Sequence, residues 1–151
     1  MNRTDYTRRA TSVAHAGSVA IGGSNPVRLQ SMTNTPTLDT DASVNQCIRL
    51  AEAGAELVRL TAQGTAHAAN LANISRRLRE AGITTPLVAD IHFNPAAAFA
   101  AVEAGVEKVR INPGNFIDFY QFLPRYPHNV HSHIAGNESD SGFSGRTHKF
   151  R

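Results

Sequence analysis

Residues 86–112 read PLVADIHFNPAAAFAAVEAGVEKVRIN and contain two apolar runs joined by an alanine-rich run. Its first apolar run, 87–91, predicts a strand that is entered through a proline. The alanine-rich run 95–104 predicts a helix with Pro95 in its first turn and Gly105 as its stop, and 108–112 predicts a second strand. A helix that links two strands of one sheet makes them parallel, so this stretch is a β-α-β unit.

The preceding residues repeat the same rhythm. The predicted strands there are 27–31 and 57–61, and the predicted helices are 41–53 and about 65–81. Gly54 and Gly82 follow the two helices as stop signals. The sequence therefore predicts an α/β fold in which successive β-α units build a parallel sheet.

The two ends of the chain depart from this rhythm. Residues 12–16 and 19–21 flank a short turn and predict an N-terminal β-hairpin that could plug the bottom of a barrel. Residues 124–151 are rich in His, Ser, Gly and Asn, keep neither period, and are predicted to be mostly disordered. We therefore expect a β-α part over 1–118 and a separate tail over 119–151.

Composition and charge exclude several classes of ligand and site. The chain has 151 residues and a net charge of +3, and its basic residues are scattered, which favours a small anionic ligand over a nucleic acid. The absence of a long apolar stretch predicts no membrane span and a cytoplasmic location. Cys47 is the only cysteine, so the chain can form neither an internal disulfide nor a zinc or iron–sulfur site that needs several thiolates. Its place on the apolar stripe of helix 41–53 predicts a role in the core.

Polar side chains gather at the carboxyl ends of the predicted strands. Residues two apart in a strand share a face, and the carboxyl ends of parallel strands form one rim. The pairs and triplets are Gln30, Met32 and Asn34; Arg59 and Thr61; Asp90 and His92; and Arg110 and Asn112. The pattern predicts that four strands bring functional side chains to a common mouth.

Each candidate also has a plainer interpretation. Arg59 and Arg110 could be solvated surface residues, but a guanidinium inside a strand is more readily explained by anion binding. Asp90 and His92 could be a satisfied buried pair, or an orienting carboxylate beside an imidazole that donates a hydrogen bond or moves a proton. Residues 112–115 form a turn signal whose amides also suit a polar ligand. No metal site is predicted, because the histidines at 128, 131 and 133 lack an acidic or thiol framework.

Four segments in this order carry a family resemblance: 30–35 (QSMTNT), 54–59 (GAELVR), 86–93 (PLVADIHF) and 110–115 (RINPGN). Together they resemble the N-terminal part of the 4-hydroxy-3-methylbut-2-enyl diphosphate synthases over about residues 7–118. Residues 61–64 (TAQG) are more similar to the longer, three-domain form of these enzymes.

The resemblance implies a TIM-type βα barrel that binds 2-C-methyl-D-erythritol 2,4-cyclodiphosphate in the methylerythritol phosphate route to isoprenoids. It also implies reduction through a [4Fe-4S] cluster in a further domain, with ferredoxin or flavodoxin as the electron donor. By position, Arg59 and Arg110 match diphosphate-binding arginines. The resemblance also matches polar residues around the same pocket: Asp90, His92, Asn112 and Asn115. Together with the strand pattern, we expect Asp90 and His92 to be catalytic and Asn34, Asn112 and Asn115 to bind substrate.

The chain also departs from the family pattern. A complete barrel takes about 250 residues, and four predicted strands make about half of one. Cys47 is not a counterpart of the cluster ligands, and the tail over 119–151 does not resemble the family. We therefore expect a fragment, inactive alone, with open edges at 27–31 and 108–112 that favour association. A half-barrel that dimerises and binds diphosphate without redox activity is one alternative, and a pteroate-binding barrel is another.

Overall fold

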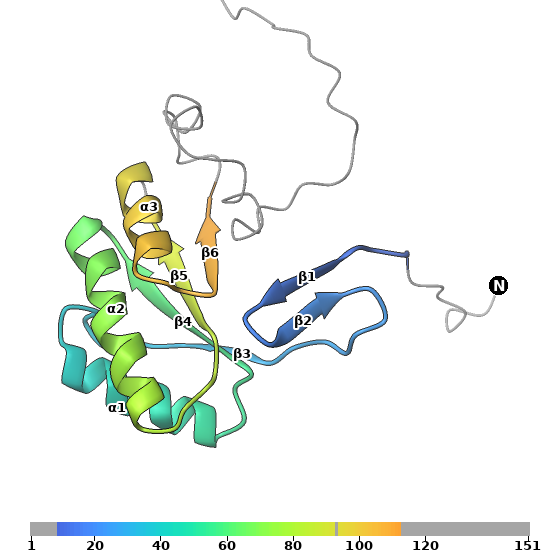
Figure 1. Ribbon diagram of the computed structural model, residues 1–151, viewed down its shortest axis with the longest axis horizontal. Helices are drawn as coiled ribbons and strands as arrows, with labels where there is room; N and C mark the ends of the chain where they lie inside the picture. Colours follow the sequence, from blue (N-terminus) through green and yellow to red (C-terminus); the bar gives the residue numbers. More distant parts are fainter. Residues whose placement is uncertain (1–8, 93, 113–151) are drawn as a thin grey trace, which may run out of the picture.

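The computed structural model describes residues 9–92 and 94–112, which form a hairpin and a helix-covered parallel sheet (Figure 1). The elements are β1 (Val13–Ala16), β2 (Val19–Gly22), β3 (Gln30–Met32), α1 (Thr40–Glu52), β4 (Leu57–Ala62), α2 (Thr65–Glu80), β5 (Leu87–Ile91), α3 (Pro95–Glu103) and β6 (Lys108–Ile111). The sheet has the order β3-β4-β5-β6, and all its neighbours are parallel. The predicted α/β fold is confirmed.

The three helices lie against one face of the sheet and form the core with it (Figure 1). Alternate residues of the central strands point to this face, among them Leu60 on β4 and Ala89 on β5. They pack against Leu71, Ile74 and Leu78 of α2, all fully buried. Because side chains alternate along a strand, the residues between them point to the opposite face, which no helix of the described part covers.

Local signals account for the helix boundaries. The Asp39 carboxylate caps α1 by accepting from the Ala42 N–H at 3.0 Å. The Asn94 side chain caps α3 in the same way, with Pro95 as its first residue. Gly54, after α1, has φ of +96°, a left-handed conformation that glycine adopts without strain. The predicted helices therefore agree with the observed ones to within one residue at each end.

The predicted hairpin is confirmed and covers the amino-terminal end of the sheet. β1 and β2 pair in antiparallel register, with Ala16 opposite Val19. Ala16 is buried together with Leu57 and Val88, at the start of β4 and in the first half of β5. In a barrel this is the bottom, so the hairpin leaves the carboxyl ends of the strands open.

The predicted strand at 27–31 is wrong in its first half. Val27 and Leu29 are 82% and 64% exposed, and the observed strand is β3, Gln30–Met32. The reason is that β4 begins only at Leu57, so no strand lies opposite the earlier residues. In place of a strand, the Glu56 carboxylate lies opposite Arg28 and Leu29. It accepts hydrogen bonds from the Leu29 N–H and from Arg28 Nη1, both at 2.8 Å.

These contacts give the stability of the fold a predictable pH dependence. The hydrogen bonds from the Leu29 N–H and from Arg28 lower the pKa of Glu56 below its ordinary value of 4.5. A lowered pKa in the folded state stabilises the fold above the unfolded pKa, and this contribution is lost as the pH falls through the folded pKa. The urea concentration at the midpoint of unfolding should be lower for Glu56→Gln than for the wild type at about pH 7. This gap between the two midpoints should disappear in acid. Glu52→Gln, at an exposed position of α1, is the control; a gap that is constant with pH would contradict the prediction.

Cys47 is buried among the core residues, as the sequence predicted, and burial raises the pKa of its thiol to about 11. Since the thiolate is the reactive form, the folded chain should resist a thiol-specific reagent near neutral pH. Addition of urea should release one equivalent of reactive thiol. A Cys47→Ala/Glu52→Cys variant, which moves the thiol to the surface of α1, should react without denaturant. Equal rates for native and unfolded wild type would contradict this burial.

No helix in the described ranges is long and apolar enough to cross a membrane. The predicted tail lies outside those ranges, as do the histidines at 128, 131 and 133.

Candidate functional site

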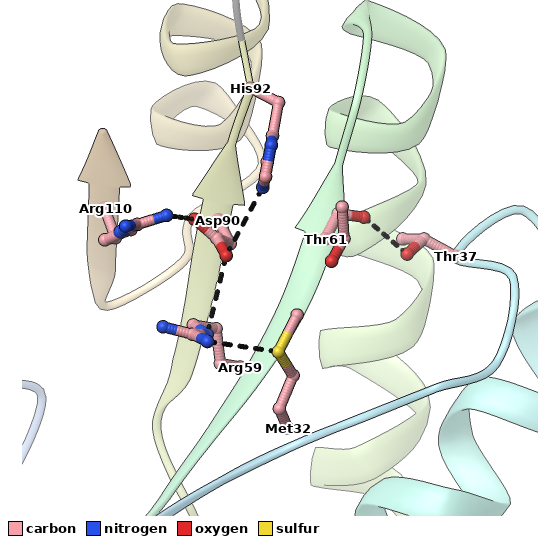
Figure 2. A network of polar contacts seen from close by, with 7 residues as sticks. All are labelled: Met32, Thr37, Arg59, Thr61, Asp90, His92 and Arg110. Atoms are coloured by element: carbon pink, nitrogen blue, oxygen red, sulfur yellow. Dashed lines mark hydrogen bonds and ion pairs between the residues drawn. The ribbon is translucent and has the colours of Figure 1, made fainter. Parts of the chain in front are cut away.

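The Asp90 cluster, made of Arg59, Asp90, His92 and Arg110, lies on the sheet face opposite the helices (Figure 2). Arg110 Nη1 donates to Asp90 Oδ1 at 2.8 Å. The other carboxylate oxygen, Oδ2, lies 3.5 Å from Arg59 Nε and 3.5 Å from His92 Nε2. One carboxylate therefore contacts two guanidinium groups and an imidazole.

The parallel register explains why these residues meet. Asp90 is on β5, between β4 and β6, and its Cα partners are Thr61 on β4 and Arg110 on β6. Arg59 lies two residues before Thr61 and so shares its face of the sheet. The predicted convergence of the two arginines and the imidazole on one mouth therefore agrees with the structure.

The Asp90 cluster combines one buried side chain with three that are partly exposed. The Asp90 side chain is only 3% exposed, whereas those of Arg59, His92 and Arg110 are 28%, 37% and 43% exposed. A buried carboxylate thus contacts basic side chains that still reach solvent. With one negative charge against two permanent positive charges, the site has a positive surplus that suits an anion.

Arg59 is only weakly satisfied by its protein neighbours. Its Nη2 donates to the sulfur of Met32 at 3.1 Å, and a thioether is a weak acceptor. Its Nε is buried and makes no hydrogen bond among the described residues, although Asp90 Oδ2 lies 3.5 Å away as an ion-pair partner. An anionic oxygen would be a better partner for this guanidinium than the groups around it.

The loop that follows β3 is fixed by residues that no sequence pattern singled out. Thr37 is buried and its hydroxyl donates to the Thr61 carbonyl at 2.6 Å (Figure 2). Asn70 of α2 donates to the Thr37 carbonyl at 2.8 Å and to the Thr40 hydroxyl at 2.9 Å. These partners are distant in the chain and carry no local sequence signal, so only the fold identifies them.

The three asparagines predicted to bind substrate have different positions. The side-chain oxygen of Asn34 accepts from Gln46 Nε2 of α1 at 2.6 Å, and Asn34 makes no contact with the Asp90 cluster among the interactions described. Asn112 directly follows β6 and is exposed. Asn115 lies outside the described residues. The substrate-binding role of all three stays a prediction.

The donor set of this chain does not fit an iron–sulfur cluster. Cys47 is the only cysteine of the sequence and is buried in the core. Within 9–92 and 94–112, no group of three or more His, Cys, Asp or Glu side chains could hold a metal ion. No reaction step through a metal or cluster is therefore assigned to these residues.

Comparison with known proteins identifies the barrel. Residues 11–136 match the GcpE TIM-barrel domain. The chain belongs to this family. Its four-stranded parallel sheet is thus part of a GcpE-type TIM barrel, and the alternative of a pteroate-binding barrel is wrong. The matched range extends past residue 118, where the resemblance noted in the sequence ends, into the tail that was expected to be unrelated to the family.

Curated relatives agree with this GcpE assignment. The chain is 59% identical over 120 residues to a 4-hydroxy-3-methylbut-2-en-1-yl diphosphate synthase (flavodoxin) of Akkermansia muciniphila, covering 80% of this chain and 20% of that protein. It is 60% identical over 114 residues to the Parabacteroides distasonis protein of that name, covering 76% and 18%. For the Leptospira interrogans protein of that name the values are 52% over 120 residues, 80% and 18%. The chain spans about a fifth of the length of these relatives.

Proposed function

We propose that this chain supplies the diphosphate-binding side of the barrel of a 4-hydroxy-3-methylbut-2-en-1-yl diphosphate synthase, the name its relatives carry. The observation that carries the proposal is the Asp90 cluster, in which a buried carboxylate on β5 contacts two partly exposed arginines, one from each of the neighbouring strands β4 and β6. The proposed ligand is 2-C-methyl-D-erythritol 2,4-cyclodiphosphate, whose two phosphoryl groups match a pair of guanidinium groups in charge.

Arg59 and Arg110 bind phosphate oxygens in this proposal. Among its hydrogen bonds in the described residues, Arg110 uses Nη1 for Asp90, which leaves other N–H groups of the planar fork for a ligand. Arg59 Nη2 exchanges the Met32 sulfur for a phosphate oxygen, a stronger acceptor. Asp90 holds both guanidinium groups in place before the ligand binds. Charges fixed in this way need no reorganisation when the ligand arrives.

His92 acts on the same ligand. Its imidazole lies 3.5 Å from Asp90 and is 37% exposed, so it can be oriented by the carboxylate and still reach the mouth of the site. It donates a hydrogen bond or a proton to an oxygen of the bound cyclodiphosphate.

Reduction of the cyclodiphosphate is proposed to require residues other than the Asp90 cluster and Cys47. Since one buried cysteine cannot hold the family's cluster, the chain alone is proposed to bind the cyclodiphosphate without reducing it. The electron donor of the complete enzyme is proposed to be flavodoxin, after the names of the relatives.

The test is calorimetric titration of the full 151-residue chain. The cyclodiphosphate and inorganic pyrophosphate should both bind, with affinity that falls as salt is added, because the contacts are ionic. Methylerythritol without phosphate groups should give no heat. Equal binding of the unphosphorylated sugar alcohol, or no binding of any of the three, would reject the proposal.

A second candidate is a half-barrel that closes by dimerising. Within the described residues, β3 and β6 are each paired on one side only, and Met32 at the β3 edge is partly exposed. Sedimentation velocity distinguishes the two candidates. A dimer that binds the cyclodiphosphate favours this second function, and a monomer that binds it favours the first.

A further inference from the structure

A six-residue pattern occurs twice in the sequence. One copy runs from the preceding turn into β4, and the other runs from the preceding turn into β6. The two copies are GAELVR at 54–59 and GVEKVR at 105–110, which share Gly, Glu, Val and Arg at the same places. Each glycine follows a helix and has a positive φ, +96° and +77°. Each arginine belongs to the Asp90 cluster.

The two glutamates make the same contacts. Glu56 accepts the Leu29 N–H with Oε2 and Arg28 Nη1 with Oε1, both at 2.8 Å. Glu107 accepts the Leu87 N–H with Oε2 and Arg79 Nη2 with Oε1, both at 2.7 Å. Each carboxylate thus ties the backbone at the entry of the neighbouring strand to the entry of its own strand.

The correspondence continues into the strands. Three residues after the tied amides lie Met32 and Asp90, and three residues after the glutamates lie Arg59 and Arg110. The register pairs Met32 with Arg59 and Asp90 with Arg110, and both pairs are in side-chain contact, at 3.1 and 2.8 Å. The sheet is therefore made of two equivalent units, β3-α1-β4 and β5-α3-β6.

The connecting helices do not explain this equivalence. The tied amide and its glutamate are 27 residues apart in the first unit and 20 in the second, and α1 has 13 residues where α3 has 9. Different crossovers reach the same register, and the contact at the strand entries is a feature that both units share. A slip of one residue would turn each arginine to the helix-covered face.

We propose that Glu56 and Glu107 are positioning residues that fix the registers of the two units, Glu56 setting Arg59 against Met32 and Glu107 setting Arg110 against Asp90, so that two guanidinium groups face one diphosphate. The inference rests on the proposed function for its ligand. The register itself is a property of the chain without ligand.

The sign of the effect separates positioning from charge. Glu56 and Glu107 are anions, so their removal should strengthen binding of another anion if only charge matters. With inorganic pyrophosphate as the probe and the full chain as the protein, Glu107→Ala should instead weaken binding about tenfold, the equivalent of one charge-assisted hydrogen bond. Glu107→Gln should restore most of the affinity, because an amide oxygen still accepts the Leu87 N–H. Glu80→Ala, which removes an exposed carboxylate from α2, is the matched control.

A second measurement needs no ligand. The side-chain Nε–H signals of the two arginines report their surroundings in nitrogen–proton correlation spectra. Glu107→Ala should shift the Arg110 signal and leave that of Arg59, and Glu56→Ala should do the reverse. Tighter or unchanged pyrophosphate binding by Glu107→Ala, or unmoved arginine signals in both folded variants, would overturn the inference. A wild type that binds neither pyrophosphate nor the cyclodiphosphate would reject the proposed function, while the spectra still decide on the register.

Discussion

Replacement of both Arg59 and Arg110 by methionine is expected to lower the free energy of unfolding by about 3 kcal/mol. The double variant would leave the Asp90 carboxylate, 3% exposed, beside His92 without either permanent positive charge. Removing the partners of a buried charge costs about 3–5 kcal/mol. The lower end applies here because both arginines are partly exposed and water already screens part of the attraction.

A third substitution tests this explanation. Adding Asp90→Leu to the double variant removes the unpaired charge, and replacing a whole buried ionic group by apolar residues is often neutral. Urea unfolding should therefore show that the triple variant recovers most of the loss. Arg76→Met, which breaks an exposed ion pair with Glu80 on α2, should change stability by no more than about 0.5 kcal/mol. A triple variant no more stable than the double one would show that packing, and not the buried charge, causes the loss.

The parts of the fold with local causes could be predicted from the sequence. Asp39, Asn94 and Pro95 begin helices through contacts with their own first turns, and Gly54 ends one by its left-handed backbone. The meeting of Asp90 with Arg110 was also predictable, because parallel pairing and side-chain alternation are fixed by geometry once the strands are known.

The remaining features depend on partners that are distant in the chain. Residues 27–29 have the pattern of a strand but lie opposite the Glu56 side chain, and a local pattern contains no information on what lies opposite. Asn34 has the position of a rim residue, but its side-chain oxygen bonds Gln46 on α1. The role of Glu107 depends on a contact with the Leu87 amide, 20 residues earlier in the chain. Sequence periodicity assigns a residue to a face, and it does not choose among the partners available there.

Arg110→Met is expected to weaken binding of the cyclodiphosphate about 100-fold, the largest effect on affinity that we expect from one substitution at the site. Charge-assisted hydrogen bonds contribute about 1.5–3 kcal/mol each, and a factor of 100 lies near the upper end of that range. The upper end applies because the guanidinium is already held by Asp90 at 2.8 Å, so binding orders no flexible side chain. Titration calorimetry on the folded variant measures the effect, with Arg76→Met as a control that should bind like the wild type.

Arg110→Lys separates the charge of the guanidinium from its geometry. Lysine keeps the positive charge opposite Asp90, so this variant should remain folded where the methionine variant is weakened. Its ammonium is a point charge without the planar fork, and it cannot hold Asp90 on one edge and a phosphate on another in a fixed plane. We therefore expect an intermediate loss, about tenfold. Wild-type affinity in the lysine variant would mean that a positive potential alone attracts the diphosphate, and wild-type affinity in the methionine variant would remove Arg110 from the binding site.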